Sequence, residues 1–145
     1  MGKKDKNKNV IKRVIKNKPK ETVKKKREKI IPFHGKVFIT ASFNNTIITI
    51  TDLNGNALGW GSTGKVGFKG ARKSTPYAAS QATENLAAKM AEGGMKQVDV
   101  IISGPGMGRD AAVKSVKNAG LKIVSLADVT PIPHNGCRPK GRRRV

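Results

Sequence analysis

Residues 36–62, KVFITASFNNTIITITDLNGNALGWGS, decide the fold of this chain. Two runs rich in β-branched and aromatic residues, KVFITASF and TIITIT, are separated by Asn44-Asn45, and Asn tolerates the positive φ angles of a tight hairpin turn. A second turn signal, Asn54-Gly55, leads into a third run at about residues 57–62. The stretch therefore predicts three antiparallel strands that follow one another as a meander.

A glycine-rich segment and a helix follow the meander. Residues 61–74, GSTGKVGFKGARKS, hold four glycines and four basic residues, which predicts a loop. Ser74 or Thr75 can cap a helix whose first turn accommodates Pro76, and Gly93-Gly94 should stop it. The face that this helix buries should carry Ala79, Ala82, Leu86 and Met90.

The rest of the domain alternates strands and helices. QVDVIIS at 97–103 predicts a buried strand, GPGMGR at 104–109 a turn, RDAAVKSVKNA at 109–119 a helix stopped by Gly120, and LKIVSLADV at 121–129 a final strand. The order is β-β-β-α-β-α-β, and strand-helix-strand connections favour parallel neighbours. We therefore expect an α/β fold, in which two helices pack on a mixed five-stranded sheet.

Charge divides the chain into three parts. The whole chain is net +21, with thirty Lys and Arg against nine Asp and Glu. Residues 1–30 hold fourteen of these basic residues and three acids, and residues 131–145 hold five and no acid, whereas residues 31–130 are only net +5. We expect a Lys-rich N-terminal extension, an α/β domain and a basic, Pro-containing C-terminal tail. Such an excess of positive charge predicts a polyanionic partner.

The distribution of the charge favours nucleic acid over a membrane. Most of the charge lies in the two extensions rather than on an amphipathic membrane-binding helix. No apolar run approaches the ~18–20 residues of a membrane span, and the N-terminus lacks the apolar stretch of a signal peptide. We therefore expect a cytoplasmic protein.

Metal and cofactor sites are disfavoured. Cys137 is the only cysteine, so no internal disulfide can form. His134 lies three residues before it, but only the distant His34 could join the pair, which is too few ligands for zinc. We expect no metal and no cofactor.

Two kinds of enzyme, a P-loop nucleotide hydrolase and a metal-dependent nuclease, are disfavoured because residues that they need are missing or scattered. Gly59-x-x-x-x-Gly64-Lys65 matches a phosphate-binding P-loop only until Val66, where a Ser or Thr must bind magnesium. In addition, Thr75 at the helix start comes ten positions after Lys65, whereas a P-loop runs directly into its helix. A metal-dependent nuclease needs several carboxylates that converge on two metal ions. The candidates are instead scattered along the chain, at Asp52, Glu84, Asp99, Asp110 and Asp128. Asp52 and Asp110 are expected as turn and helix-start residues.

The glycines at 104–108 allow two interpretations. The turn can offer backbone N–H groups and a helix dipole to an RNA phosphate, aided by Arg109. Equally, a tight turn can require glycines for its backbone alone. Because the chain has only six aromatic residues, recognition should rest on phosphates, sugar hydroxyls and shape rather than on base stacking.

Four segments together resemble the bacterial-type small-subunit ribosomal protein eleven family: ASFNNTIITITDLNGNALGW, GFKGARKSTPYAA, GPGMGR and DVTPIPHNGCRP. The resemblance covers about residues 31–145. It implies a ribonuclease H-like fold and a non-catalytic structural protein on the platform of the small ribosomal subunit. It also implies binding to 16S-type rRNA, whose helices the protein joins, and a part in the cleft that holds the Shine-Dalgarno duplex of mRNA. The implied neighbours are small-subunit proteins seven and eighteen and initiation factor three.

The resemblance carries over to particular residues. In the tail it implies RNA contacts for His134, Asn135, Gly136, Arg138, Arg142, Arg143 and Arg144. We expect Lys140 to bind RNA as another cation of the same basic tail. In the loop it implies them for Lys65, Lys69, Arg72 and Lys73, which the charge pattern selects as well, and Arg109 joins them from the glycine turn. The chain departs from the family pattern in its longer N-terminal extension, in Met107 and in Lys140-Gly141.

One alternative belongs to a different class. A non-specific DNA-compacting protein would also use basic extensions, because they neutralise the phosphates of duplex DNA equally well. Such a protein would bind DNA and RNA alike, whereas a ribosomal protein should prefer a folded RNA junction.

Overall fold

The computed structural model describes residues 31–138 together with residues 140 and 141. The predicted N-terminal extension, residues 1–30, lies outside the described residues. So do three of the predicted RNA contacts, Arg142, Arg143 and Arg144.

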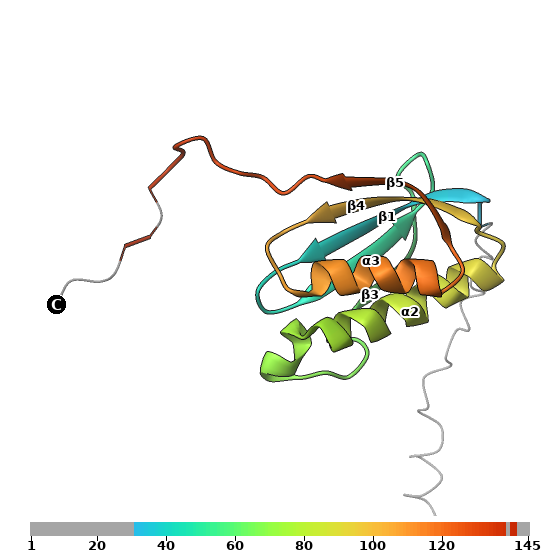
Figure 1. The fold of residues 1–145 in the computed structure, drawn as a ribbon, viewed down its shortest axis with the longest axis horizontal. Helices are drawn as coiled ribbons and strands as arrows, with labels where there is room; N and C mark the ends of the chain where they lie inside the picture. Colours follow the sequence, from blue (N-terminus) through green and yellow to red (C-terminus); the bar gives the residue numbers. More distant parts are fainter. Residues whose placement is uncertain (1–30, 139, 142–145) are drawn as a thin grey trace, which may run out of the picture.

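Five strands form one mixed sheet in the order β3-β2-β1-β4-β5 (Figure 1). β1 pairs antiparallel with β2 and β2 with β3, whereas β1 and β4, and β4 and β5, run parallel. The strands are β1 His34–Ala41, β2 Thr46–Thr51, β3 Ala57–Ser62, β4 Gln97–Ser103 and β5 Lys122–Asp128. The predicted meander, the parallel additions and the α/β class are confirmed.

Both α-helices lie on the same face of the sheet, which gives a two-layer domain (Figure 1). They are α2, Pro76–Glu92, and α3, Gly108–Asn118, and they pack on each other as well as on the sheet. Thr75 caps α2 as predicted, because its Oγ1 accepts a hydrogen bond from the N–H of Ala78 at 3.2 Å. Gly94 follows the end of α2 with a φ of 103°, which a side chain would disfavour.

The core lies between the sheet and the two helices. Alternate strand residues such as Val37, Ile39 and Val100 are fully buried against the helices, and burying each such side chain stabilises the fold by about 1.5–3 kcal/mol. α2 contributes the predicted set of buried residues, Ala79, Ala82, Leu86 and Met90. The small side chains let this helix approach the sheet closely.

Two details of the connections differ from the sequence-based expectation. The turn from β1 to β2 has four residues, and Asn44 and Asn45 do not have positive φ; among the described non-glycine residues only Asn135 does. The prediction of positive φ here was wrong because a four-residue loop needs no primed turn. Instead, the N–H of Ser42 donates to the carbonyl of Asn45 at 2.9 Å, and the N–H of Asn45 donates to the Ser42 hydroxyl at 3.1 Å.

The second difference is a short 3₁₀-helix, η1, over Gly70–Ser74, where the glycine-rich segment was predicted to be loop throughout. Two side-chain hydroxyls stabilise this helix, and each donates to the carbonyl of the residue three positions before it. Ser74 Oγ donates to the carbonyl of Ala71 at 2.8 Å, and Thr75 Oγ1 donates to that of Arg72 at 2.9 Å. Such a short element has no hydrophobic periodicity by which a sequence could reveal it.

Candidate nucleic-acid interface

One edge of the domain gathers the segments that the sequence marked as RNA-binding. β1, β3, β4 and β5 all end at this edge, and α2 and α3 begin there (Figure 1). This follows from the parallel pairing, since strands joined by helices point the same way. The edge therefore carries the basic loop between β3 and α2, the glycine turn between β4 and α3, and the start of the tail after β5. In open α/β sheets ligands usually bind outside the carboxyl ends of the strands.

The basic loop, residues 63–75, is anchored at its first residue. Thr63 is fully buried, its N–H donates to the carbonyl of Thr46 at 3.1 Å, and its Oγ1 donates to Asn45 Oδ1 at 2.6 Å. Gly67 and Gly70 have φ angles of 112° and 57°, so the loop turns where side chains would be strained. The loop that carries the cations is therefore attached to the sheet at its first residue.

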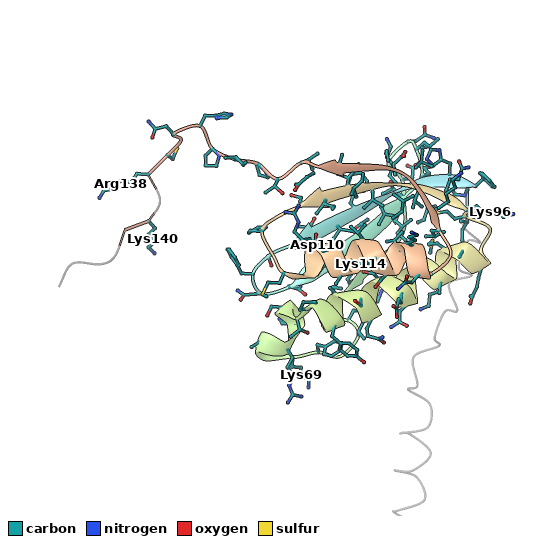
Figure 2. All side chains as sticks on the ribbon, in the orientation of Figure 1. Lys69, Lys96, Asp110, Lys114, Arg138 and Lys140 are labelled. Atoms are coloured by element: carbon teal, nitrogen blue, oxygen red, sulfur yellow. The ribbon has the colours of Figure 1, made fainter. Side chains whose placement is uncertain are left out.

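The cations of this loop point outward. Lys65, Lys69 and Arg72 are exposed and Lys73 is partly exposed. Lys65 Nζ lies 4.2 Å from the centroid of the Trp60 ring and donates to the Trp60 carbonyl at 3.1 Å. Lys69 projects away from the domain (Figure 2) and lines, with Arg72 and Phe68, a surface hollow of about 550 Å³.

These four cations have no acidic partner in the described part of the chain. There, His34 lies 3.1 Å from Asp99, and ion pairs join Arg109 to both Asp110 and Asp128. A loop cation can therefore meet a phosphate without first breaking an ion pair within the domain. A contact between such a cation and a phosphate is favourable because it releases counterions condensed on the RNA and forms a charge-assisted hydrogen bond.

The glycine turn is explained by packing. Gly104 has a φ of 102°, and a Cβ on Gly104 or Gly106 would clash with the backbone at the end of β1. A Cβ on Gly108 would lie 2.8 Å from the Cβ of Ala79 in α2. The N–H of Gly106 donates to the carbonyl of Ala41 at 2.9 Å. Close packing, against the backbone at Gly104 and Gly106 and against side chains at Gly108, therefore accounts for a glycine at all three positions.

Arg109 has partners within the domain. Its guanidinium pairs with Asp128, and Nη1 donates to the carbonyl of Gly104 at 3.3 Å. Asp128 also accepts hydrogen bonds from the side chain and the N–H of Thr130, which together with Arg109 lower the pKa of its carboxyl to about 2. Sequence reasoning missed both the pairing of Arg109 with Asp128 and the hydrogen bonds from Thr130 to Asp128. Only the latter had a local signal, since an Asp side chain often accepts from the backbone two residues further on. A contact of Arg109 with RNA stays a prediction.

The tail leaves β5 in an extended conformation and runs away from the sheet (Figure 1). Arg138 and Lys140 lie far along it (Figure 2), and His134, Asn135 and Gly136 are exposed as well. From residue 131 on, the described part of the tail forms no hydrogen bond with the domain. The structure therefore brings the loop cations to one edge but leaves the tail cations separate from them.

The acids that a nuclease would need are engaged elsewhere. Asp52 accepts hydrogen bonds from the side chain and N–H of Asn56, both at 2.8 Å, which lower the pKa of its carboxyl, and Asp110 lies in the first turn of α3. Among the described residues, no three His, Cys, Asp or Glu side chains lie close enough together to hold a metal ion. No helix in this part of the chain is long and apolar enough to cross a membrane.

Comparison with known proteins places the chain among the ribosomal proteins. A family model described as Ribosomal protein S11 matches residues 35–144. The small ribosomal subunit protein uS11 of Desulfovibrio desulfuricans is 56% identical over 127 residues, which cover 88% of this chain and 98% of that relative. The protein of the same name from Nitratidesulfovibrio vulgaris is 54% identical over 127 residues, with the same coverage. The chain belongs to the ribosomal protein S11 family, which is structural and non-enzymatic.

Proposed function

We propose that this chain is a structural constituent of the small ribosomal subunit, in the cytoplasm, and that it binds 16S-type rRNA. One observation carries the mode of binding: a loop with four cations, which have no acidic partner among the described residues, stands at the edge where the basic tail begins. The relatives named above are small ribosomal subunit proteins and share most of the chain. The family assignment and the charge pattern thus agree on an RNA partner.

The separation of the two sets of cations supports a bridging role. Lys69 and Arg72 belong to a loop of the folded domain, whereas Arg138 and Lys140 lie well out on the extended tail, as Figure 2 shows for Lys69, Arg138 and Lys140. A single RNA helix cannot easily follow both sets, so we propose that the loop holds one rRNA helix and the tail a second. The sheet keeps the two at a defined separation. The division into an extension at 1–30, a domain at 31–130 and a tail at 131–145 is part of this proposal.

The contacts should be mainly with phosphates and ribose hydroxyls. The loop offers exposed Lys and Arg side chains, which suit a phosphate backbone better than splayed bases. His134, Asn135 and Gly136 form the bend of the tail, in which Asn135 has a φ of 55°. We propose that this bend fits the backbone of one rRNA helix. Arg109 would reach RNA only by giving up part of its pairing with Asp128.

The location within the subunit is proposed from the family resemblance. We place the protein on the platform, beside small-subunit proteins seven and eighteen, where it helps to form the Shine-Dalgarno cleft for mRNA. Initiation factor three would lie nearby. In this arrangement the protein works by holding RNA in place, and no chemistry is required of it.

Sedimentation of a cell lysate tests this function. The wild-type chain, carrying an epitope tag, should co-migrate with the small subunit and with ribosomes in high-magnesium buffer, and should stay there through a moderate salt wash. A variant with Lys65, Lys69, Arg72 and Lys73 all changed to Gln should move towards the top of the gradient. The matched control changes Lys89, Lys96, Lys117 and Lys122 to Gln, which removes the same charge from the opposite end of the domain.

The gradient tests both the role of the basic loop and the ribosomal function. If the loop variant stays with the subunit as firmly as the control does, the loop is not part of the interface. If the wild-type chain sediments with the chromosome instead, the protein compacts DNA and the ribosomal proposal is wrong.

A further inference from the structure

The end of β5 is tied to the glycine turn by a small network of side chains. Asp128 Oδ1 accepts from the N–H of Thr130 at 3.0 Å and from its hydroxyl at 2.5 Å, while Oδ2 pairs with Arg109. Thr130 Oγ1 in turn accepts from the N–H of Gly104 at 3.1 Å. Arg109 Nη1 donates to the carbonyl of Gly104 at 3.3 Å, so both backbone groups of this glycine belong to the network.

We infer that Arg109, Asp128 and Thr130 are positioning residues, which set the direction in which the C-terminal tail leaves the sheet and so where its cations meet RNA. This rests on the proposed function of the tail. The three residues need not touch RNA themselves. They act through the fifteen residues that follow Thr130.

The position of the network supports this role. The N–H of Val129 donates to the carbonyl of Ile102 at 2.9 Å, which is the last ladder bond, and Thr130 is the last residue of the chain with a hydrogen bond to the domain in the described part. Thr130 is therefore the last described residue at which hydrogen bonds to the domain set the direction of the chain. A chain of ten residues spans at most about 33 Å, so a change of about 20° at its root would move its end by up to about 11 Å. This is comparable to the width of an RNA groove.

The base of the network is rigid. Gly104, to which both Arg109 and Thr130 bond, is held by its packing against Ala41 at the end of β1. The network thus connects the tail to the centre of the sheet rather than to the edge strand alone. β5 itself is almost wholly exposed, so it could not fix the tail by burial.

The network contributes to binding because it lowers the conformational entropy that the tail must lose when it binds RNA. A tail whose root is already directed loses less conformational entropy when it binds. The effect should depend mainly on the charged residues in the tail, since their attraction to phosphates gains most from correct placement. A network that merely stabilised the domain would act regardless of the charge of the tail.

The test compares Thr130→Val with Thr130→Ser in the full-length chain. Valine keeps the shape of Thr130 but loses both hydroxyl hydrogen bonds, whereas serine keeps them. With protein-free small-subunit rRNA as the probe, we expect T130V to weaken binding about tenfold and T130S to stay within about twofold of wild type. The same pair is then made in a full-length chain whose tail cations, Arg138, Lys140, Arg142, Arg143 and Arg144, are all changed to Gln. In that background T130V should change the affinity less than about twofold.

An equal loss in both backgrounds would overturn the inference, because the network would then act on the domain and not through the tail. A second readout needs no RNA. Amide hydrogen exchange at Gly104 and Thr130 should speed up at least about tenfold in T130V but not in T130S. If wild-type protein fails to bind rRNA, the proposed function is wrong. If exchange at Gly104 and Thr130 is unchanged in T130V, the hydroxyl of Thr130 does not restrain the root of the tail, and the inference is wrong.

Discussion

Thr63 Oγ1 donates a 2.6 Å hydrogen bond to Asn45 Oδ1, which joins the basic loop to the first hairpin across eighteen residues of sequence. Thr63 is fully buried, so this bond lies beneath the loop and not on its surface. Its N–H also bonds to the carbonyl of Thr46. The segment that carries Lys65, Lys69 and Arg72 is thus fixed to the sheet before it reaches the surface.

Replacing Asn45 by Ala should therefore destabilise the protein. The buried hydroxyl of Thr63 would lose its acceptor, which costs about 1–2 kcal/mol of unfolding free energy. Urea denaturation monitored by Trp60 fluorescence measures this. Asn44→Ala is the matched control, because Asn44 is an exposed neighbour in the same turn, and it should stay within about 0.5 kcal/mol of wild type. Equal losses in the two variants would assign the effect to the turn and not to the bond with Thr63.

This bond also shows what the sequence could and could not reveal. The strands and helices were predictable because period-two apolar runs, Asn54-Gly55 and the Thr75-Pro76 start are local signals. The role of Asn45 was not predictable, since the turn alone seemed a sufficient reason for an Asn there. Its partner depends on how the chain folds back, and no local pattern contains that information.

Arg109 shows the same limit at the candidate site. A basic residue beside a glycine turn predicts an anion contact, and only the parallel pairing of β4 with β5 brings Asp128 beside it. The loop cations, by contrast, were predictable from charge alone. A lysine or arginine in a glycine-rich loop is exposed in most folds, so its availability does not depend on tertiary pairing.

The glycine turn makes a second prediction about stability. A Cβ on Gly108 would lie 2.8 Å from the Cβ of Ala79 and would also clash with the side chain of Thr46. Gly108→Ala should then lower the unfolding free energy by about 1–3 kcal/mol, as overpacking usually does. In the control, Gly64→Ala, the nearest neighbour would be Lys73 Cδ at 3.6 Å, which is an ordinary contact. Unfolding curves for the two variants that coincide would contradict close packing at the start of α3.

The electrostatic role of the loop can be measured one residue at a time. If Lys69 neutralises one rRNA phosphate, Lys69→Gln should make the slope of log affinity against log salt shallower by about 0.7–0.9. Lys96→Gln is the control, since Lys96 lies at the other end of the domain (Figure 2) and should leave the slope unchanged. Filter binding to small-subunit rRNA between low and moderate salt gives both slopes. A loss of affinity without a change of slope would mean that Lys69 acts by shape and not by charge.

Asp128 predicts a characteristic dependence of stability on pH. Hydrogen bonds from Thr130, aided by Arg109, lower the pKa of its carboxyl to about 2, below the value of about 3.9 of an unfolded chain. The folded state therefore prefers the ionised carboxylate, and this preference is fully present above about pH 5 and lost as the pH falls through about 4 to 2.

Urea unfolding of wild type and of Asp128→Asn, from pH 7 to pH 2.5, isolates this contribution, because the other carboxylates are common to both proteins. The stability difference between them should be constant between pH 7 and pH 5 and then shrink as the pH falls. A difference that changes between pH 7 and pH 5 would point to another group, and a difference that stays constant down to pH 2.5 would show that Asp128 is not held in its ionised form. In the second case the hydrogen bonds from Thr130 and the pairing with Arg109 would not favour the ionised carboxylate of Asp128.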